Sequence, residues 1–477
     1  MSAPLFSAAL SESLHAAARA HLLREDGQED LCFALWRPSR GAKRFTALVR
    51  ALVMPMEGER DVHGNASFQP AFLERAISLA QSADCGLALL HSHPLGRGWQ
   101  GMSKDDIETE SGRAAAVLAA TGLPFLGLTL AGLDECWSAR FWERVAPRSY
   151  ERRECASVRV VGERLRVCYN DAILPPPDAN EQQIRTVSAW GEADQANLVR
   201  LRVGLVGAGS VGGFIAESLA RAGFTNIPIL DFDKIEKKNL DRLCYATRDD
   251  IGKKKAERLA DRLREIATAD RIEAIAIDAA VFEEEGWRAA LDCDILVSCV
   301  DRPWGRHAMN LMAYAHLIPV VDGGISVRVN RRGKLAAADW RAHVATPGRP
   351  CLQCLGQYDP AHVQLERTGQ LDDPVYIAGL DPSHLLRAGQ NVSAFSMACA
   401  SQQLLQLLAL VLAPLDQSNP GAQIYHFVGH QLDRDPIIEC GPDCFFPPLI
   451  ADGDRCPFPA TGIRCERVDA QIASGPE

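Results

Sequence analysis

A glycine-rich segment between an apolar run and an amphipathic stretch constrains the fold of this chain more than any other feature. The segment, residues 207–212, has the sequence Gly-Ala-Gly-Ser-Val-Gly. Val203–Val206 before it predicts a buried strand, Gly213–Gly223 after it predicts a helix, and Ile227–Asp231 predicts the next strand. Strand, helix and parallel strand in this order form a βαβ unit, so the sequence predicts an α/β, Rossmann-like fold here.

The glycines also predict a phosphate-binding turn. Gly207, Gly209 and Gly212 allow a tight turn and let phosphate groups approach the N-terminus of the following helix. Asp231 comes at the end of the next predicted strand, where an acid can hold a ribose hydroxyl group. The pattern alone is also typical of NAD-dependent dehydrogenases, so it predicts a nucleotide site without deciding which nucleotide binds.

Composition and charge narrow the classes of protein. The chain has 477 residues, 47% of them hydrophobic and 23% charged, which predicts a soluble protein of two or three domains. Its net charge of −10 argues against nucleic acid or an anionic membrane as the main partner. The apolar run Leu404–Leu412 is too short to cross a membrane. Fifteen cysteines without an apparent signal peptide favour a reducing, cytoplasmic location.

The chain divides into four parts. Residues 1–155 mix strands and helices and begin with a predicted helix over Leu5–Leu23. Residues 156–180 contain a run of three prolines and predict a linker. Residues 181–450 hold the βαβ unit, and residues 451–477 form a tail rich in cysteine and proline.

Two histidines in the first part have a spacing that suits metal binding. Cys85–Leu90 predicts a buried strand, and alternation along that strand points His91 and His93 to the same side. Ser103 and Asp106 follow after a short loop. Imidazole and carboxylate groups are typical ligands of a catalytic Zn²⁺ ion, which keeps one position open. A strand-end pair of histidines that bonds to nearby carbonyl groups is the alternative interpretation.

Three short segments together resemble the JAMM motif of the JAB/MPN metalloproteases, which cut peptide or isopeptide bonds at the C-terminus of ubiquitin-like proteins. The segments are Met54–Gly58, His91–Pro94 and Ser103–Asp106. The resemblance implies an N-terminal JAB/MPN-type α/β metalloprotease domain. Nine residues separate His93 from Ser103, more than the family usually has, which implies a longer loop at the cleft.

The same resemblance implies a role for each of five residues. His91, His93 and Asp106 would bind the catalytic Zn²⁺ ion. Glu57 would accept a proton from the attacking water molecule, whose pKa the ion lowers. Ser103 would donate a hydrogen bond to the oxyanion of the tetrahedral intermediate.

The segment Asp231–Arg242 resembles the adenylyltransferases MoeB and ThiF and the adenylation domain of ubiquitin-activating enzymes. By this resemblance, Asn239, Arg242 and Lys255 would contact the triphosphate of ATP, and Asp301 would hold Mg²⁺. In these enzymes the C-terminal carboxylate of a small β-grasp protein attacks the α-phosphate and releases pyrophosphate. A solvated basic face is the alternative interpretation of Arg242 and Lys255.

Arg185 bears on the oligomeric state. It precedes the first strand of the predicted βαβ unit. In the resembling adenylyltransferases an arginine at this position enters the active site of the partner subunit. The resemblance therefore implies a homodimer with shared active sites.

A second, structural zinc site is predicted near the C-terminal end. Cys351 and Cys354 form a Cys-x-x-Cys half-site, which the resembling proteins complete with two later cysteines. Cys440 and Cys444 are the best candidates for these. The alternatives are Cys456 and Cys465. Free buried thiols are the simpler interpretation of the whole set.

A cysteine that could accept the activated acyl group is not evident. Residues 355–398 contain none, and Cys399 lies in an apolar stretch that predicts burial. Three options stay open. The reaction stops at the acyl-adenylate, a hydroxyl group such as that of Thr368 or Ser383 accepts the acyl group, or a distant cysteine does so.

The two resemblances together predict a bifunctional cytoplasmic enzyme, similar to those of bacterial ubiquitin-like conjugation systems. One half would activate a ubiquitin-like β-grasp protein with ATP and Mg²⁺ for a conjugating enzyme. The other would mature or deconjugate the same protein by zinc-dependent hydrolysis. The alternative is activation of a sulfur-carrier protein for cofactor or tRNA thiolation. A noncatalytic scaffold and a dehydrogenase are further alternatives, and both leave the intact set of site residues unexplained.

Overall fold

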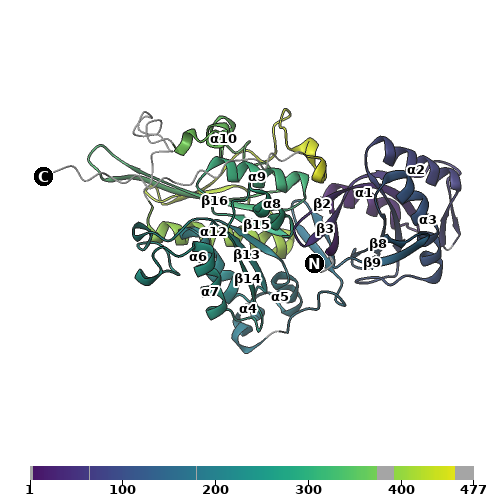
Figure 1. The fold of residues 1–477 in the computed structure, drawn as a ribbon, viewed down its shortest axis with the longest axis horizontal. Coiled ribbons are helices and arrows are strands. Elements are labelled where there is room, and N and C mark those ends of the chain that lie inside the picture. The colour runs from purple at the N-terminus through teal and green to yellow at the C-terminus, as the bar shows by residue number, and fades with distance from the viewer. Residues whose placement is uncertain (1–3, 64, 179, 373–390, 457–477) are drawn as a thin grey trace.

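In the computed structural model, the chain folds into two α/β units, each built on its own sheet (Figure 1). The first sheet has nine strands from residues 5–169, and the second has eight strands from residues 203–434. The structure describes residues 4–63, 65–178, 180–372 and 391–456.

The strands of the first sheet lie in the order β11-β10-β1-β3-β2-β6-β7-β8-β9. A separate two-stranded ribbon, β4–β5, precedes helix α2. The strands are β1 (Leu5–Ser11), β2 (Leu31–Arg40), β3 (Arg44–Val53), β4 (Arg60–His63), β5 (Asn65–Phe68), β6 (Gly86–His93), β7 (Phe125–Ala131), β8 (Trp137–Ala146), β9 (Ser149–Glu154), β10 (Ser157–Val161) and β11 (Leu165–Tyr169). The helices are α1 (Glu12–Leu22), α2 (Pro70–Ser82) and α3 (Lys104–Thr121).

The second sheet has the order β14-β13-β12-β15-β16-β17-β18-β19. Its first five strands run parallel, and the last three continue it in antiparallel fashion. The strands are β12 (Val203–Val206), β13 (Asn226–Leu230), β14 (Glu273–Ile277), β15 (Ile295–Ser298), β16 (Val320–Val329), β17 (Leu335–Ala345), β18 (Gln423–His426) and β19 (Gln431–Arg434). The helices are α4 (Ile184–Trp190), α5 (Glu192–Val199), α6 (Ser210–Arg221), α7 (Lys255–Ile266), α8 (Glu284–Leu291), α9 (Pro303–Ala315), α10 (Pro360–Arg367) and α12 (Ser393–Leu412).

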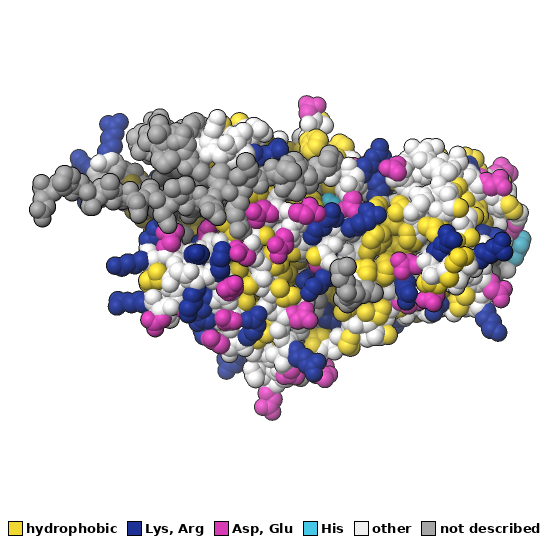
Figure 2. All heavy atoms as spheres, viewed as in Figure 1, with side chains coloured by type: hydrophobic (Ala, Val, Ile, Leu, Met, Phe, Trp, Pro, Cys, Tyr) yellow, Lys and Arg dark blue, Asp and Glu magenta, His cyan; other side chains and the backbone are white. Residues whose placement is uncertain are grey.

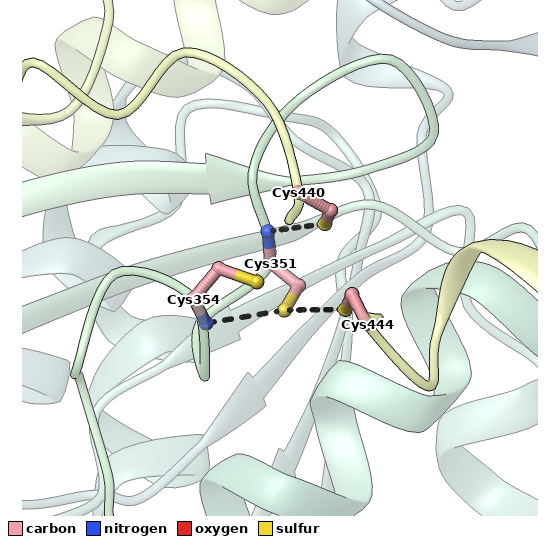
Figure 3. Close-up of side chains that lie close together, drawn as sticks. All are labelled: Cys351, Cys354, Cys440 and Cys444. Atoms are coloured by element: carbon pink, nitrogen blue, oxygen red, sulfur yellow. Dashed lines mark hydrogen bonds between the residues drawn. The ribbon is translucent and has the colours of Figure 1, made fainter. Parts of the chain in front are cut away.

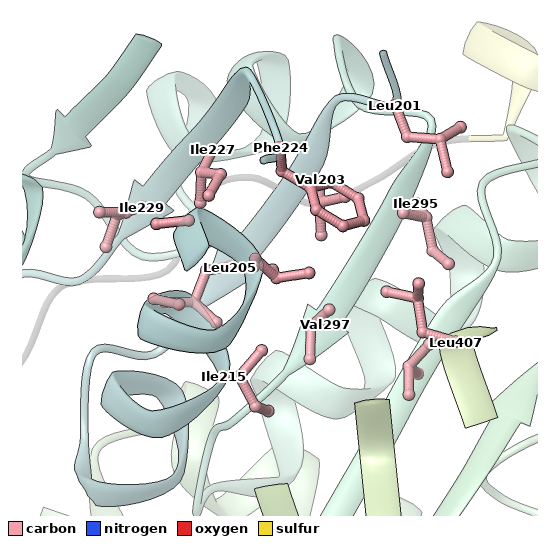
Figure 4. Close-up of a cluster of buried hydrophobic side chains, with 14 of the residues drawn as sticks. Leu201, Val203, Leu205, Ile215, Phe224, Ile227, Ile229, Ile295, Val297 and Leu407 are labelled. Atoms are coloured by element: carbon pink, nitrogen blue, oxygen red, sulfur yellow. The ribbon is translucent and has the colours of Figure 1, made fainter. Parts of the chain in front are cut away.

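Helices cover both faces of the parallel strands, which is the Rossmann-like arrangement predicted from the sequence. Helices α6, α7 and α12 pack on one face, and α8 and α9 pack on the other (Figure 1). In the first of these layers, Leu205, Ile229 and Val297 of neighbouring strands lie with Ile215 of α6 and Leu407 of α12 (Figure 4). Parallel strands with both faces covered need continuous apolar runs, which is the pattern these strands show.

Helix α12 is the one described helix that is long and apolar enough, by length and composition alone, to cross a membrane. It spans 20 residues, more than the apolar run recognised in the sequence. In the structure it packs against α6, β16 and β17. Its apolar side chains therefore contribute to the core of the second unit.

The predicted helix over Leu5–Leu23 is only partly correct. Leu5–Ser11 forms strand β1, and helix α1 begins at Glu12. Strand β1 lies between β3 and β10 and pairs in parallel with both, so sheet burial outweighs the local preference for helix. Ser11 ends the strand and caps the helix, because its Oγ accepts a hydrogen bond from the N–H of Leu14 (3.3 Å).

The predicted linker, residues 156–180, begins later than expected. Its first part forms β10 and β11, which complete one edge of the first sheet. Buried valines at 158, 160 and 161 hold β10 against β1. The connection between the two sheets therefore follows Tyr169 and includes the proline run.

The two units meet at a buried carboxylate. Asp294 lies just before β15, and its Oδ1 accepts hydrogen bonds from Arg44 on β3 (2.6 Å) and Arg159 on β10 (2.9 Å). These three side chains are at most 5% exposed. Burial favours the neutral acid, but the two arginines hold the pKa of Asp294 at about 2. The interface is therefore ionic and buried at the amino-terminal ends of the parallel strands.

Residues 447–456, which we call the strap, return from the second unit to the first. Asp452 in the strap forms ion pairs with Arg37 on β2 and with Arg50 on β3 (2.9 Å). The short helix η8 (Gly453–Arg455) packs against β2. The predicted tail, residues 451–477, is thus attached to the first unit in its described part, and residues 457–477 lie outside the described residues.

Charges of both signs share the surface. On the face shown in Figure 2, Lys and Arg side chains are intermixed with Asp and Glu side chains over both units. Among the residues drawn in colour there, no continuous basic stripe of the kind that nucleic-acid-binding proteins present is visible.

Candidate functional site

The glycine-rich loop connects β12 to α6, as the sequence predicts. Gly207 has a φ of +100°, and a Cβ atom there would lie 2.6 Å from the carbonyl oxygen of Cys299. A Cβ atom at Gly212 would lie 2.1 Å from the carbonyl oxygen of Gly207, whereas Gly209 has nothing within 4 Å. Glycine is therefore required at positions 207 and 212. The open space at Gly209 leaves room for a phosphate group at the N-terminus of α6.

Asp231 braces this loop at the carboxyl end of β13. Its Oδ2 accepts a hydrogen bond from the N–H of Ala208 (2.6 Å), and its Oδ1 accepts one from the N–H of Asp233 (2.8 Å). Burial raises the pKa of Asp231 to about 6, although the nearby Lys255 ammonium opposes the shift. Each carboxylate oxygen keeps a lone pair, so a ribose hydroxyl group could still donate to it.

Two predicted cationic residues lie near the loop. The Nζ of Lys255 contacts Asp233 Oδ2 (2.7 Å), and its side chain is only 12% exposed, so it does not belong to a solvated basic face. Arg242 donates from Nη1 to the carbonyl of Lys238 (2.7 Å) and to Asp241 Oδ1 (2.8 Å). Lys255 is therefore a largely covered cation beside Asp233. Arg242 lies in the segment that covers the N-terminus of α6, because the Ser210 hydroxyl donates to the carbonyl of Arg242.

Three other predicted residues lie in different settings. Asn239 is buried, and its Oδ1 accepts a hydrogen bond from the N–H of Glu236 (3.0 Å), so its side chain caps the short helix η2 (Lys237–Asn239). Asp301 is exposed in the bend after β15, at the carboxyl edge of the sheet. Arg185 is exposed on α4, which packs on η1 (Glu181–Gln183) and α5. Its entry into a partner subunit stays a prediction.

Four cysteines from two distant segments come together in the second unit (Figure 3). They are Cys351, Cys354, Cys440 and Cys444. Their sulfur atoms all lie within 4.8 Å of one another. The Sγ atoms of Cys351 and Cys444 are 3.7 Å apart, close to the ~3.8 Å that a tetrahedral site with Zn–S bonds of about 2.3 Å would give. Cys456 does not belong to this cluster, and Cys465 lies outside the described residues.

Replacing Cys440 with serine should lower the zinc content from about two ions per chain to about one, because a hydroxyl group is a poor zinc ligand. We also expect a lower melting temperature, since a structural zinc ion stabilises the fold that binds it. Elemental analysis and a thermal melt measure both effects. Cys456→Ser is the matched control, because Cys456 is buried and lies outside the cluster. Equal zinc contents in Cys440→Ser and the unmodified protein would contradict the assignment.

The histidine cluster forms where the sequence predicts it. His91 and His93 lie at the end of β6, and Asp106 lies in the first turn of α3. Asp106 Oδ1 is 3.7 Å from His91 Nε2, and Asp106 Oδ2 is 3.8 Å from His93 Nε2. Two imidazoles and a carboxylate around one point are a donor set that fits a catalytic zinc ion. The structure thus brings the three predicted ligands together, and the ion itself stays a prediction.

The loop after His93 is held in place by its own side chains. Ser103 Oγ accepts a hydrogen bond from the N–H of Asp106 (3.1 Å), and Asp106 Oδ2 accepts one from the N–H of Ser103 (2.9 Å). This capping box fixes the start of α3 and orients Asp106. A hydrogen bond also joins Gln100 Oε1 to His93 Nδ1 (3.2 Å). The hydroxyl proton of Ser103 stays available to donate, as its predicted role requires.

A buried network contacts His91 at Nε2, the nitrogen that also faces Asp106. Arg140 forms two hydrogen bonds to Glu110, and both side chains are 1% exposed. The Nη1 of Arg140 also donates to Thr129 Oγ1 (2.6 Å), which is hydrogen-bonded to His91 Nε2 (3.3 Å). Burial, with the charge of Arg140 as the next cause, lowers the pKa of His91 to about 3. His91 is therefore a neutral, oriented imidazole, which is the form that binds a metal.

The structure points to a general base other than the predicted Glu57. Glu57 is exposed in the turn between β3 and β4, whereas Glu29 is half-buried and interacts electrostatically with His93. Burial raises the pKa of Glu29, and the His93 charge opposes that shift. Leu31 on β2 pairs with His91 on β6, and continuing this antiparallel register places Glu29 opposite His93. Among the described residues, Glu29 is thus the candidate base.

Three residues named in the sequence analysis bear on acceptance of the acyl group: Cys399, Thr368 and Ser383. Cys399 is buried, and burial raises the pKa of its thiol to about 12, so it is unsuited to nucleophilic attack. The Thr368 hydroxyl donates to carbonyl oxygens of α10 (both 3.1 Å). Ser383 lies outside the described residues. The three options drawn from the sequence therefore stay open.

The parallel core and the glycine loop before α6, which is open at Gly209, are typical of nucleotide-binding α/β proteins. The model of the ThiF family matches residues 181–436, just over half of the chain. The chain therefore belongs to the ThiF family.

Several curated proteins are similar to this chain. Molybdopterin-synthase adenylyltransferase of Escherichia coli (strain K12) is 27% identical over 33% of this chain and 59% of its own length. SAMP-activating enzyme E1 of Haloferax volcanii is 28% identical over 35% of this chain and 57% of its own length. Sulfur carrier protein ThiS adenylyltransferase of Bacillus subtilis (strain 168) is 32% identical over 35% of this chain and 46% of its own length. The chain thus spans about half the length of these relatives.

Among solved structures, that of E. coli MccB with ATP covers 56% of this chain and 74% of that chain. It has 18% sequence identity and a TM-score of 0.42.

Proposed function

We propose that the second unit is an adenylyltransferase that uses ATP to activate the C-terminal carboxylate of a small β-grasp protein. The observation that carries this proposal is the ThiF family match over a glycine loop that is open at Gly209. The names of the relatives include activation of SAMP and of the sulfur carrier ThiS. Lys255, which is largely covered and paired with Asp233, supplies a fixed positive charge beside the loop, as phosphate chemistry requires.

The chain's own residues would act on ATP as follows. Backbone N–H groups at the start of α6 would bind phosphate oxygens, and Asp231 would accept a hydrogen bond from the ribose. Lys255 and Arg242 would balance charge that develops on the phosphates when the carboxylate attacks the α-phosphate and pyrophosphate leaves. Asp301, which is exposed at the carboxyl edge of the sheet, would hold Mg²⁺. When bound, the ion would neutralise charge on the phosphates.

The class of β-grasp protein follows from the same proposal. A ubiquitin-like modifier would pass to a conjugating enzyme, whereas a sulfur carrier would receive sulfur and become a thiocarboxylate. The first is our leading proposal, because the histidine cluster of the first unit could reverse a conjugation. We propose a homodimer in the cytoplasm, with no nucleic acid or membrane as partner.

We further propose that the first unit is a zinc-dependent hydrolase for bonds at the C-terminus of the same protein. His91, His93 and Asp106 would hold the ion, which supplies Lewis-acid activation of water when bound. Glu29 would take the proton of the attacking water molecule, and Ser103 would donate to the developing oxyanion. The observation that favours this second function is that His91 and His93 at the end of β6 come together with Asp106 of α3. The register of β2 on β6, continued by two residues, brings Glu29 opposite His93.

Pyrophosphate exchange tests the adenylation. We expect Asp301→Ala to slow ATP–pyrophosphate exchange by at least about a hundredfold, because the developing phosphate charge loses its metal counterion. The assay contains the purified chain, Mg-ATP and the β-grasp protein encoded nearest to its gene. Asp249→Ala, which removes an exposed acid on the short helix η3 (Arg248–Asp250), is the matched control and should leave exchange unchanged. Exchange that survives Asp301→Ala would remove Asp301 from the site.

A further inference from the structure

A cavity of about 580 Å³ lies on the first unit, beside the edge strand β11 and against α5 of the second unit. Its lining combines two thiols with aromatic and charged side chains. The residues that matter here are Trp99, Cys136, Arg166, Cys168 and Arg200. This cavity is separate from the glycine loop and from the cysteine cluster, and it contains no residue of the histidine cluster.

The two thiols line the same cavity although they are 32 positions apart in the sequence. Cys136 directly precedes β8, Cys168 lies on β11, and each thiol shifts the pKa of the other. The backbone N–H of Trp137 also donates to Cys168 Sγ (3.1 Å). Both cysteines are partly exposed. Other described cysteines differ from this pair in their exposure: Cys32 and Cys155, for example, are buried.

The geometry gives the two thiols unequal chemistry. The backbone N–H of Trp137 donates to Cys168 Sγ, which favours the thiolate form of this residue. The neighbouring Cys136 thiol lowers the pKa of the Cys168 thiol, although burial opposes this, and Arg166 adds to the lowering. Cys168 and burial raise the pKa of the Cys136 thiol. Cys168 is therefore the attacking thiol, and Cys136 is the resolving thiol, which reacts with the oxidised form of Cys168.

We propose that Cys136 and Cys168 are a redox pair that a hydroperoxide oxidises reversibly to a disulfide. The Cys168 thiolate attacks one peroxide oxygen, the O–O bond breaks, and a sulfenic acid and one molecule of water or alcohol form. The Cys136 sulfur then attacks the sulfenic sulfur and releases water. Two thiols lose two electrons in total, and the peroxide gains them. An external dithiol reverses the reaction by exchange.

The segment that contains Cys136 is hydrogen-bonded to the loop that follows His93. Asp134, two residues before Cys136, accepts a hydrogen bond from the N–H of Gly98 (2.8 Å). Ser138, two residues after it, accepts one from the N–H of Gln100 (2.6 Å), and Gln100 contacts His93. The disulfide would thus form in the segment that anchors the loop between β6 and α3.

Peptide mapping tests the proposal on the full chain. The protein is treated with hydrogen peroxide at a few equivalents, its remaining thiols are alkylated, and it is digested without reductant. We expect a disulfide-linked peptide pair containing positions 136 and 168 that dithiothreitol abolishes. In Cys136→Ser, dimedone should trap a sulfenic acid at Cys168. In Cys168→Ser, Cys136 should stay alkylatable after peroxide.

Cys244 supplies an internal control in the same digest. It is exposed, but burial of part of its thiol raises its pKa to about 11, so it should stay unoxidised at this dose. The proposal is overturned if Cys136 and Cys168 both stay fully alkylatable while Cys244 reacts. It is equally overturned if Cys136→Ser yields no dimedone adduct at position 168, because Cys168 would then not be the attacking thiolate.

Discussion

Replacing Glu29 with glutamine should reduce hydrolysis by about 10²–10⁴-fold while leaving the zinc content unchanged. Glutamine keeps the size of the side chain but cannot accept the proton of the attacking water molecule. The three candidate ligands, His91, His93 and Asp106, are untouched by this change. The measurement is cleavage of a fusion between the proposed β-grasp substrate and a C-terminal reporter, with zinc measured in the same preparation.

Glu57→Gln is the matched control, because it makes the same chemical change at the exposed position that the sequence suggests. We expect it to cleave at the rate of the unmodified protein. If Glu57→Gln were inactive and Glu29→Gln active, the base would be Glu57 after all. Loss of zinc from Glu29→Gln would show that Glu29 is a ligand or a structural residue, and not a base.

Asp294→Ala should lower the free energy of unfolding by about 3–5 kcal/mol, the usual effect of removing one partner from a buried ion pair. Two arginines, Arg44 and Arg159, would be left in the interface without their common counterion. Denaturant unfolding followed by fluorescence measures the effect. Asp241→Ala is the comparison, because its salt bridge with Arg242 is exposed and contributes about 0–1 kcal/mol at most. Equal stabilities of the two variants would contradict the ionic account of the interface.

The same carboxylate gives a pH dependence. Because the folded pKa of Asp294, about 2, lies below the value of about 3.9 in an unfolded chain, its stabilising contribution is complete above pH 4 and is lost as the pH falls through 2. We therefore expect the unmodified protein to lose more stability than Asp294→Asn between pH 4 and pH 2. Parallel acid curves for the two proteins would show that the pKa of Asp294 is the same in the folded and unfolded states, and would contradict this account.

The sequence predicts those parts of the molecule whose signals are local. The βαβ unit follows from apolar runs around glycines, because a Cβ atom at Gly207 or Gly212 would clash with backbone. His91 and His93 lie on one side of β6 because alternate residues of a strand face the same way. The resemblance names Cys440 and Cys444 as the best partners of Cys351 and Cys354, and the structure brings these four cysteines together.

Features that depend on strand pairing could not be predicted in the same way. The register of β2 on β6 brings Glu29 to the histidine cluster, and no local sequence pattern around Glu29 predicts that register. Its only local signal is a place two residues before an apolar run. Strand β1, Leu5–Ser11, and strand β10 escape local prediction for a related reason, because they pair with each other across more than 140 residues. Strand β11 then extends the sheet by pairing with β10.

The strap has a consequence for how the protein is made. A ribosome releases the N-terminal unit first, and domains generally fold in the order in which they emerge. Arg37 on β2 nevertheless pairs with Asp452, which is synthesised more than 400 residues later. Arg44 and Arg159 likewise lack their ion-pair partner until Asp294 has been synthesised. The first unit therefore lacks these ion-pair partners until the second unit has been translated, so we expect a prematurely terminated chain to release a destabilised first unit.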